Sequence, residues 1–341
     1  MGVDLGDAIP REKIELQDIG GWTLAVDAYN TLYQFLAIIR GPSGEHLKDS
    51  RGRVTSHISG LFYRNINLME LGIKLVYVFD GKPPELKAEE IERRTAQRRE
   101  AKDQYLKALQ AGEMAQARKY AEASTVLRRD MVADAKLLLD AMGIPYVDAP
   151  SEGEAQASVM AAEGTVNAVA SQDHDSIIFG APILVRNVTI SGKRRLPSKG
   201  IVINVQPERI TLKSVISATG LTREQLVDFA ILLGTDFNPD GFEGVGPVRA
   251  LKYLKRYGSL EKVTELKEEI SKVNYTAIRD LYLHPPATPG VRPEWKQPDP
   301  QALLKYLVDE HSFSPDRVKA ALGRVAATSK PKSETLEKWF G

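Results

Sequence analysis

Residues 75–81 read LVYVFDG, an apolar run rich in β-branched residues that stops at Asp80. Two further runs have the same form, LAV at 24–26 before Asp27 and AVA at 168–170 shortly before Asp173. Short, continuously apolar runs are typical of parallel strands buried on both faces. Functional groups collect beyond the carboxyl ends of such strands, so we expect the three aspartates to lie together at one edge of a sheet.

Helical patterns separate these runs along the chain. They extend from Ile58 to Leu71 and from Asp130 to Met142, and Gly143 follows the second at the position that a helix C-cap favours. Strands that alternate with helices indicate an α/β protein. We therefore expect a mostly parallel central sheet flanked by helices.

The composition limits the chemistry of any site. The chain has 341 residues, 43% of them hydrophobic and 27% charged, which is enough for a sizeable core. It has no cysteine, and its five histidines lack the spacing of a zinc site, so disulfides, zinc ribbons and thiol nucleophiles are excluded. Any bound metal must be held by oxygen. The net charge of +1 averages over acidic and basic regions.

Two features predict a soluble, cytoplasmic protein without a membrane partner. No apolar run approaches the roughly 20 residues that span a bilayer. The segment from Met1 to Pro10 carries Asp4 and Asp7 where a signal peptide carries positive charge.

The segment from Gly81 to Arg129 differs from the rest because it is mostly charged or small. It consists of helix-forming residues with Gly112 as the expected break, so we predict two projecting helices that order on a partner. The alternative is a solvated helical hairpin without a binding role, which is the usual meaning of a charge run. The pattern alone does not decide between them.

The next segment predicts a short hairpin and two helices. Residues 188–190 and 201–205 alternate like strands around a basic turn that contains Lys193 and Arg194. Residues 225–233 and 248–257 are predicted helices, and the second is entered through Gly244-Val245-Gly246-Pro247. Proline at the first helical position fits such an entry.

The last part of the chain begins with a proline-rich stretch at 285–300, which we expect to cross the surface. Helices are predicted at 301–311 and 316–326. Residues 328–341 are expected to form a flexible tail.

Seven acidic residues stand out by their positions: Asp27, Asp80, Glu152, Glu154, Asp173, Asp175 and Asp236. Taken singly, each has a structural explanation. An aspartate after a strand commonly bonds the backbone of a turn, and Ser151 with Glu154 fits a capping box. Two acids one residue apart, as at Asp173 and Asp175, repel each other unless something neutralises them.

The joint pattern favours a metal site. Three strand ends, one helix start and one helix end would all bring acids to the same edge of the sheet. Mg²⁺ prefers carboxylate and water ligands, and two such ions about 4 Å apart activate a water and stabilise the leaving oxygen of a phosphodiester. We therefore predict chemistry on phosphate.

Several motifs occur in an order known from one family of nucleases. They are Val78-Phe79-Asp80-Gly81, Ala149-Pro150-Ser151-Glu152-Gly153-Glu154-Ala155, Ser171-Gln172-Asp173-His174-Asp175, and Leu233-Gly234-Thr235-Asp236 followed by Gly244-Val245-Gly246-Pro247. The chain resembles the flap endonucleases, structure-specific 5′ nucleases, and above all those of archaea. The resemblance runs nearly end to end and implies a PIN-like nuclease fold with a helical arch insertion and a helix-turn-helix motif.

The resemblance also implies the activity. It implies a Mg²⁺-dependent 5′ flap endonuclease with 5′-3′ exonuclease activity, which cuts branched DNA near the junction of single and double strands in Okazaki-fragment maturation and DNA repair. It implies two Mg²⁺ ions, for which Mn²⁺ substitutes. Asp27, Asp80, Glu152 and Glu154 would serve one ion, with Asp173, Asp175 and Asp236 nearer the second.

Two cations correspond to catalytic residues of the family, Lys87 seven and Arg94 fourteen residues after Asp80. Their separation is close to two helical turns, so both can face a phosphate from one side of a helix. The expected role is electrostatic stabilisation of the transition state. The alternative is solvated surface charge, whose removal would change little beyond salt sensitivity.

The resemblance assigns DNA contacts as well. Tyr33 would stack on a base, although a tyrosine after a strand is more often core. The helix entry would hold phosphates by backbone amides, with a monovalent cation at this turn. The expected DNA-binding residues are Tyr33, Arg40, Arg53, Lys193, Arg194, Gly244, Gly246, Arg249 and Lys252.

Near the carboxyl end, Leu336, Trp339 and Phe340 resemble the motif by which these nucleases dock on the sliding clamp. The motif usually begins with glutamine three residues before the leucine, where this chain has Ser333.

We expect a monomer with one composite nuclease domain at 1–327 and the tail at 328–341. Its parts are an N-terminal nuclease region at about 1–98, a helical arch at about 81–130, an internal nuclease region at about 116–258 and C-terminal helices at about 259–327. A non-catalytic scaffold for branched DNA is disfavoured because all seven acids, Lys87 and Arg94 are present. A carboxylate nuclease acting on RNA is disfavoured by the helix entry and the clamp-like tail.

Overall fold

The structure, a computed structural model, describes residues 5–6, 9–41, 44–195 and 202–328. Its centre is a seven-stranded sheet in the order β1-β9-β6-β5-β2-β3-β4. A separate hairpin pairs β7 with β8. The strands are β1 (Glu12–Lys13), β2 (Thr23–Asp27), β3 (Lys74–Phe79), β4 (Tyr146–Asp148), β5 (Ala168–Ala170), β6 (Ile183–Arg186), β7 (Gly192–Arg195), β8 (Val202–Val205) and β9 (Glu208–Thr211).

The three apolar runs of the sequence are the neighbouring strands β5, β2 and β3 at the centre of the sheet. All pairings from β4 through β3, β2 and β5 to β6 are parallel, and only β9 and β1 add antiparallel edges. Asp27 ends β2, Asp80 follows β3 and Asp173 follows β5, so the three aspartates lie at one edge. The predicted mostly parallel sheet is confirmed.

Helices cover both faces of this sheet. The α-helices of the described residues, including those that do not contact the sheet, are α1 (Ala28–Ile38), α2 (Ser56–Glu70), α3 (Ala88–Gln110), α4 (Met114–Ala123), α5 (Arg129–Met142), α6 (Gly153–Ala162), α7 (Asp175–Ile178), α8 (Leu212–Thr219), α9 (Arg223–Leu233), α10 (Pro247–Tyr257), α11 (Lys267–Ile270), α12 (Tyr275–Leu283), α13 (Pro300–Leu304) and α14 (Pro315–Thr328). No helix in these described ranges combines the length and apolar character that a membrane crossing needs.

Alternate strand residues supply two separate cores, because successive side chains of a strand point to opposite faces. Val76 and Val78 of β3 pack with α6, α7 and α9, whereas Leu75, Tyr77 and Phe79 pack with α1, α2, α5 and α14. The sheet is therefore buried on both sides, which explains why its central strands read as continuous apolar runs.

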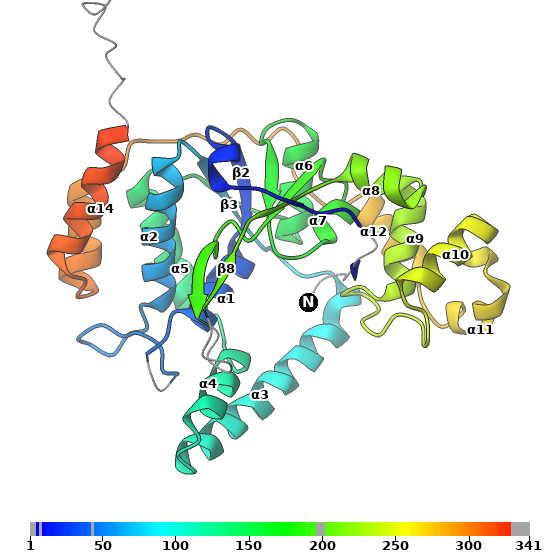
Figure 1. Cartoon of the computed structure of the whole chain (residues 1–341), viewed down its shortest axis with the longest axis horizontal. Coiled ribbons are helices and arrows are strands. Elements are labelled where there is room, and N and C mark those ends of the chain that lie inside the picture. Colours follow the sequence, from blue (N-terminus) through cyan, green and yellow to red (C-terminus); the bar gives the residue numbers. More distant parts are fainter. Residues whose placement is uncertain (1–4, 7–8, 42–43, 196–201, 329–341) are drawn as a thin grey trace, which may run out of the picture.

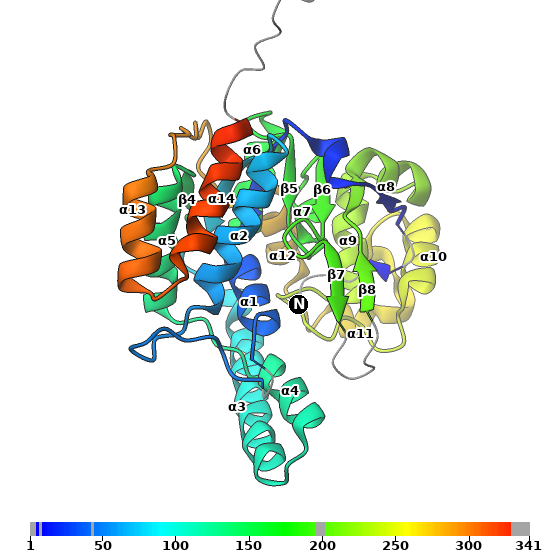
Figure 2. The ribbon, with the colours of Figure 1, turned by 60° about the vertical axis from the view of Figure 1, so that its left-hand side comes forward.

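The charged segment forms the two predicted projecting helices, α3 and α4, which extend away from the body (Figures 1 and 2). Gly112 makes the break between them with φ of 72°, a left-handed conformation that suits glycine. Small residues such as Ala108 and Ala117 are buried between the two helices, so the pair packs closely without a large apolar core.

The hairpin prediction was partly wrong. Residues 188–190 are not a strand but belong to a turn, with Ile190 N donating to Asn187 O and Asn187 at φ of 62°. The apolar residue Val188 points into the core, which explains the misleading alternation. The paired strands are β7 and β8, so Lys193 and Arg194 lie on a strand and not in the turn, whose residues 196–201 fall outside the described ranges.

The proline-rich stretch follows the surface between α12 and α13, as expected, and is fixed at several points. Trp295 Nε1 donates to Leu75 O at 2.7 Å, and Gln156 bonds both backbone groups of Thr288. The helix predicted at 301–311 is α13, which continues as the π-helical turn η6 (Lys305–Glu310). The clamp-like residues Leu336, Trp339 and Phe340 lie outside the described residues.

Candidate functional site

Six of the seven predicted acids line one cavity of about 580 Å³ at the carboxyl edge of the sheet. Strand ends supply three of them, the start of α6 supplies two, and the segment after α9 supplies the sixth. They are Asp27, Asp80, Glu152, Glu154, Asp173 and Asp236. Residues separated by up to 209 positions in the chain therefore face one space.

Local backbone bonds fix two of these acids. Asp27 Oδ1 accepts a hydrogen bond from Asn30 N at 3.0 Å and so caps α1, as expected for an aspartate after a strand. Asp27 nevertheless lines the cavity. Asp80 Oδ1 accepts from Gly153 N at 2.6 Å at the start of α6. A Cβ on Gly153 would lie 2.7 Å from this oxygen, so glycine is needed for the helix to approach the acid.

The capping-box explanation for Glu154 is wrong. The N-cap of α6 is Glu152, whose side chain makes no capping hydrogen bond, and the first N–H of the helix is bonded by Asp80. Ser171 Oγ instead donates to Glu154 Oε1 at 2.5 Å, across the gap between β5 and α6. The Glu154 carboxylate therefore faces the strand ends instead of its own helix terminus.

Asp175 is the one predicted acid that does not line the cavity. It begins α7, is buried, and accepts a hydrogen bond from Tyr282 Oη at 3.2 Å. The pKa of Glu154 is raised well above its ordinary value by burial first, then by Asp173 and then by Asp175, so the Asp175 charge still acts on the cavity wall. Asp175 thus lies one layer behind the cavity wall.

Two cations from the base of the projecting helices reach into the cavity. Lys87 Nζ lies 2.5 Å from Glu152 Oε2 and 3.0 Å from Asp236 Oδ2. Arg94 bonds the other oxygen of Asp236 at 2.5 Å and is held from behind by the buried Glu90 at 2.6 Å. The predicted pair therefore faces the acid cluster from one side, so these two cations are not simply solvated surface charge. A binding role for the rest of the two helices stays a prediction.

The acids are held in an environment that disfavours their charge. Burial and then Asp80 raise the pKa of Asp27 well above its ordinary value. Burial and then Glu152 raise the pKa of Asp80 to about 6, although Asp80 keeps contact with solvent that screens part of this effect. Burial alone would lower the pKa of Lys87, but Glu152 and Asp236 raise it on balance.

The donor set fits a hard cation. Every acid offers carboxylate oxygen, and clustered carboxylates with raised pKa values need positive charge to ionise together. In the described residues no three His, Cys, Asp or Glu side chains are arranged as a ready metal site as they lie. Lys87 and Arg94 supply the positive charge in this conformation.

The chain matches two family models, the XPG N-terminal domain at 8–101 and the XPG I-region at 143–236. It is 50% identical to flap endonuclease 1 of Pyrococcus furiosus over 100% of this chain and 99% of the relative. It is 53% identical to that of Caldivirga maquilingensis over the full length of both. The chain belongs to the flap endonuclease family. As such it is a nuclease, a hydrolase of phosphodiester bonds.

Solved structures agree with this flap endonuclease assignment. Flap endonuclease-1 from Methanococcus jannaschii matches with a TM-score of 0.73 and 38% identity, over 96% of this chain and 98% of the other. The catalytic core of Rad2 in complex with DNA substrate matches with a TM-score of 0.68 over 92% of this chain and 96% of the other. At 22% identity, the Rad2 likeness shows the fold alone.

Tyr33 of this flap endonuclease is a cavity residue and not a core residue. It is only partly buried, and Arg98 of α3 lies over its ring, with Cζ 4.9 Å from the ring centroid. The projecting helix therefore covers the aromatic face to which the family resemblance gives a base-stacking role, and that role stays a prediction.

Arg40 and Arg53 hold the loop between α1 and α2 in place. Arg40 donates to Gly44 O at 2.6 Å and Thr125 Oγ1 at 2.7 Å, and burial lowers its pKa. Arg53 pairs with Asp49 at 2.7 Å and is about half exposed. These bonds give both arginines a structural task, and their contact with DNA stays a prediction.

The helix-turn-helix is formed by α9 and α10. Gly244 has φ of 69°, and a Cβ on Gly246, the N-cap of α10, would meet nothing within 4 Å, so this turn is open to a ligand. Lys252 is exposed, whereas Arg249 folds back onto Tyr253 Oη at 2.7 Å. Contact of these four residues with DNA remains a prediction.

Several supporting residues were missed from the sequence. Gly153 N donates a hydrogen bond to Asp80, Ser171 donates one to Glu154, and Tyr282 donates one to Asp175. The guanidinium group of Arg98 lies over the ring of Tyr33. Gly153 lies between two conspicuous glutamates and gave a readable signal. Tyr282 gave none, because its contact with Asp175 joins elements 107 residues apart.

Proposed function

We propose that this flap endonuclease hydrolyses one phosphodiester near the junction of a 5′ flap with duplex DNA, and that hydrolysis depends on Mg²⁺. The single observation that carries the proposal is the cavity in which six carboxylates face Lys87 and Arg94. Phosphoryl chemistry needs positioning and charge stabilisation more than covalent help from the protein.

Asp27, Asp80, Glu152, Glu154, Asp173 and Asp236 would hold two Mg²⁺ ions, or Mn²⁺ in their place, with Asp175 supporting them from behind. The ions would supply an activated water and stabilise the leaving oxygen. Their binding requires ionised carboxylates, so raised pKa values at Asp27, Asp80 and Glu154 would make loading depend on pH.

Lys87 and Arg94 would stabilise the charge that develops on the scissile phosphate. Each already contacts a carboxylate at 2.5 Å, so both extend far enough to meet a phosphate placed over the acids. A phosphate group would offer the same kind of oxygen acceptor that they now bind. Preformed donors of this type act where charge develops and need little reorganisation.

The remaining contacts would recognise the shape of the branch and not its sequence. Gly244 and Gly246 would present backbone amides to duplex phosphates, with Arg249 and Lys252 beside them and a monovalent cation at the turn. Tyr33 would stack on a base next to the cut, and Arg40, Arg53, Lys193 and Arg194 would line the path of the DNA. Leu336, Trp339 and Phe340 would dock on a sliding clamp.

The deciding experiment uses a 5′-labelled double-flap DNA with Mg²⁺ or with EDTA, and maps the product to the nucleotide. Single-stranded DNA, full duplex and an RNA flap serve as controls. We expect a metal-dependent cut at the junction of the DNA flap. Tight binding without cleavage would favour a scaffold, and preference for the RNA flap would favour an RNA nuclease.

A further inference from the structure

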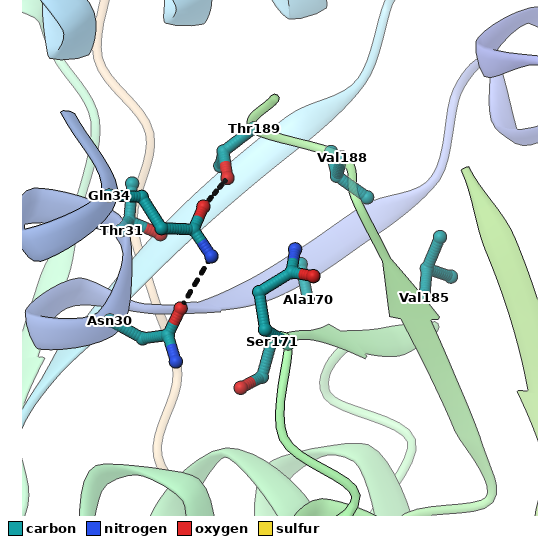
Figure 3. Close-up of a pocket in the computed structure, with 9 residues that line it drawn as sticks. Asn30, Thr31, Gln34, Ala170, Ser171, Val185, Val188 and Thr189 are labelled. Carbon is teal, nitrogen blue, oxygen red and sulfur yellow. Dashed lines mark hydrogen bonds between the residues drawn. The ribbon is translucent and has the colours of Figure 1, made fainter. Parts of the chain in front are cut away.

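A chain of hydrogen bonds leads from the turn before the β7–β8 hairpin to the acid cluster. Thr189 Oγ1 donates to Gln34 Oε1 at 3.0 Å, and Gln34 Nε2 donates to Asn30 Oδ1 at 2.8 Å (Figure 3). Asn30 Nδ2 then donates to Asp173 Oδ2 at 3.2 Å. Asn30 and Gln34 stand four residues apart on α1, so they share one face of the helix.

The direction of every bond follows from the carboxylate. An ionised Asp173 only accepts hydrogen bonds, so Asn30 must turn its NH₂ group toward it. The carbonyl of Asn30 is then left for the NH₂ group of Gln34, and the carbonyl of Gln34 is left for the hydroxyl of Thr189. One arrangement therefore satisfies all three bonds.

Both ends of this series of hydrogen bonds are held by further contacts. At one end, the turn that carries Thr189 is held by Arg64 Nε, which donates to Val188 O at 2.9 Å. At the other end, Asn30 donates its backbone N–H to Asp27 and its side chain to Asp173. Asn30 thus contacts two acids that follow the neighbouring strands β2 and β5.

Asp173 has particular need of such support. It lies three residues beyond the end of β5, so strand pairing does not fix its side chain. Its backbone N–H donates to Ser171 Oγ at 3.2 Å. In the described part of the chain, the hydrogen bond that its carboxylate accepts comes from Asn30.

We propose that Asn30, Gln34 and Thr189 are positioning residues that fix the orientation of the Asp173 carboxylate for cleavage. The proposal rests on the function proposed above for Asp173. The three residues act through Asp173, so their loss should lower kcat and weaken the response to Mg²⁺ while affinity for DNA is kept.

The test compares single substitutions with a matched control in the same pocket. Gln34→Glu keeps the size of the side chain but presents an acceptor to the Asn30 carbonyl, which forces Asn30 to reverse. Thr189→Val replaces the hydroxyl by a methyl group of similar size. Thr189→Ser keeps the hydroxyl and loses only the methyl group. Thr31 lines the same pocket but takes no part in these three hydrogen bonds, so Thr31→Val is the control.

Four quantities are measured for each variant: kcat and KM on a double-flap DNA, the Mg²⁺ concentration at half-maximal rate, DNA affinity in Ca²⁺, and the unfolding temperature. We expect Gln34→Glu and Asn30→Ala to lower kcat by about 10- to 100-fold, the usual effect of losing a partner of a metal-binding acid. The half-maximal Mg²⁺ concentration should rise in both variants. DNA affinity in Ca²⁺ should be unchanged in Asn30→Ala, which adds no charge to the cavity. Thr189→Val should have a smaller effect that Thr189→Ser reverses.

Parental kcat and Mg²⁺ response in Gln34→Glu and Thr189→Val would overturn the proposal. So would equal losses in Thr31→Val and Thr189→Val, because they would reflect general packing. If Gln34→Glu unfolds, the three threonine variants still decide. Failure of the parent protein to need a divalent ion would instead overturn the proposed function, so the two failures are distinguishable.

Discussion

Lys87 links the arch to the acids, and replacing it should change two measurable quantities in opposite directions. In Lys87→Met the ammonium group that bridges Glu152 and Asp236 at 2.5 and 3.0 Å is lost, while the length of the side chain is kept. The bound phosphate would lose one positive donor. The free protein would lose an internal cation that competes with metal for the same oxygens.

The two magnitudes follow from these contacts. Removing one preorganised donor to a developing oxyanion costs about 10²–10³ in kcat, or about 2.7–4 kcal/mol. A hydrogen bond to a charged group contributes about 1.5 kcal/mol at the lower end, which suits a pair that keeps some contact with solvent. Relief of that competition should therefore tighten divalent binding to the free protein about tenfold.

Single-turnover cleavage of a double flap measures the first quantity, and calorimetric titration of the free protein with Ca²⁺ measures the second. Lys82→Met is the matched control, because Lys82 is exposed before the start of α3 and does not line the cavity. Cleavage within a few-fold of the parent would refute the electrostatic role. Weaker Ca²⁺ binding in Lys87→Met would refute the competition argument.

Four further outcomes are expected. Asp80→Ala or Asp173→Ala should abolish cleavage and largely spare DNA binding in Ca²⁺, and comparable turnover would contradict the metal assignment. Gly153→Ala should cost about 10-fold or more in cleavage because its Cβ would lie 2.7 Å from the Asp80 carboxylate, whereas Gly323→Ala, with open space around it, should have no such effect. Folding raises the pKa of Asp80 to about 6, so the folded protein binds a proton there more tightly than the unfolded chain does. The contribution of this proton to the free energy of unfolding is therefore fully present below about pH 4 and is lost as pH rises through about 6. The unfolding temperature in EDTA should fall across that range by this contribution and recover with Mg²⁺ near neutral pH; a flat profile in calorimetric scans would argue against it. Deleting residues 333–341 should leave cleavage of free flaps intact and remove stimulation by the clamp.

The central sheet was predictable because burial on both faces leaves a simple trace. Continuous apolar runs marked β2, β3 and β5, and the aspartate after each run marked the functional edge. The hairpin was harder, because alternation at 188–190 came from Val188 packing into the core and not from strand pairing. Alternation records which side chains are buried and does not record the hydrogen bonds of the backbone.

The acids of the site were predictable from position and family motifs, but their supports were not. Asn30, Gln34 and Tyr282 are ordinary polar residues within helices, and each acquires its role through a partner far away in the chain. Asp175 shows the converse limit. Its motif places it beside Asp173, yet the start of α7 turns it toward Tyr282 behind the cavity.

The charge balance of the cavity connects the arch with catalysis. Six acidic side chains and three basic ones, Lys87, Arg94 and Arg98, line it, so acidic groups outnumber basic groups. A phosphate entering this space would be repelled until divalent ions added positive charge. In the free protein, Lys87 and Arg94 would compete with divalent ions for the same carboxylates, which would oppose metal loading. Once a phosphate lay over the acids, Lys87 and Arg94 could bind its oxygens and release the carboxylates to the metal ions while staying in the cavity. The sign of the coupling between arch and metal should therefore reverse on binding DNA, which would favour loading of both ions where a flap is already in place.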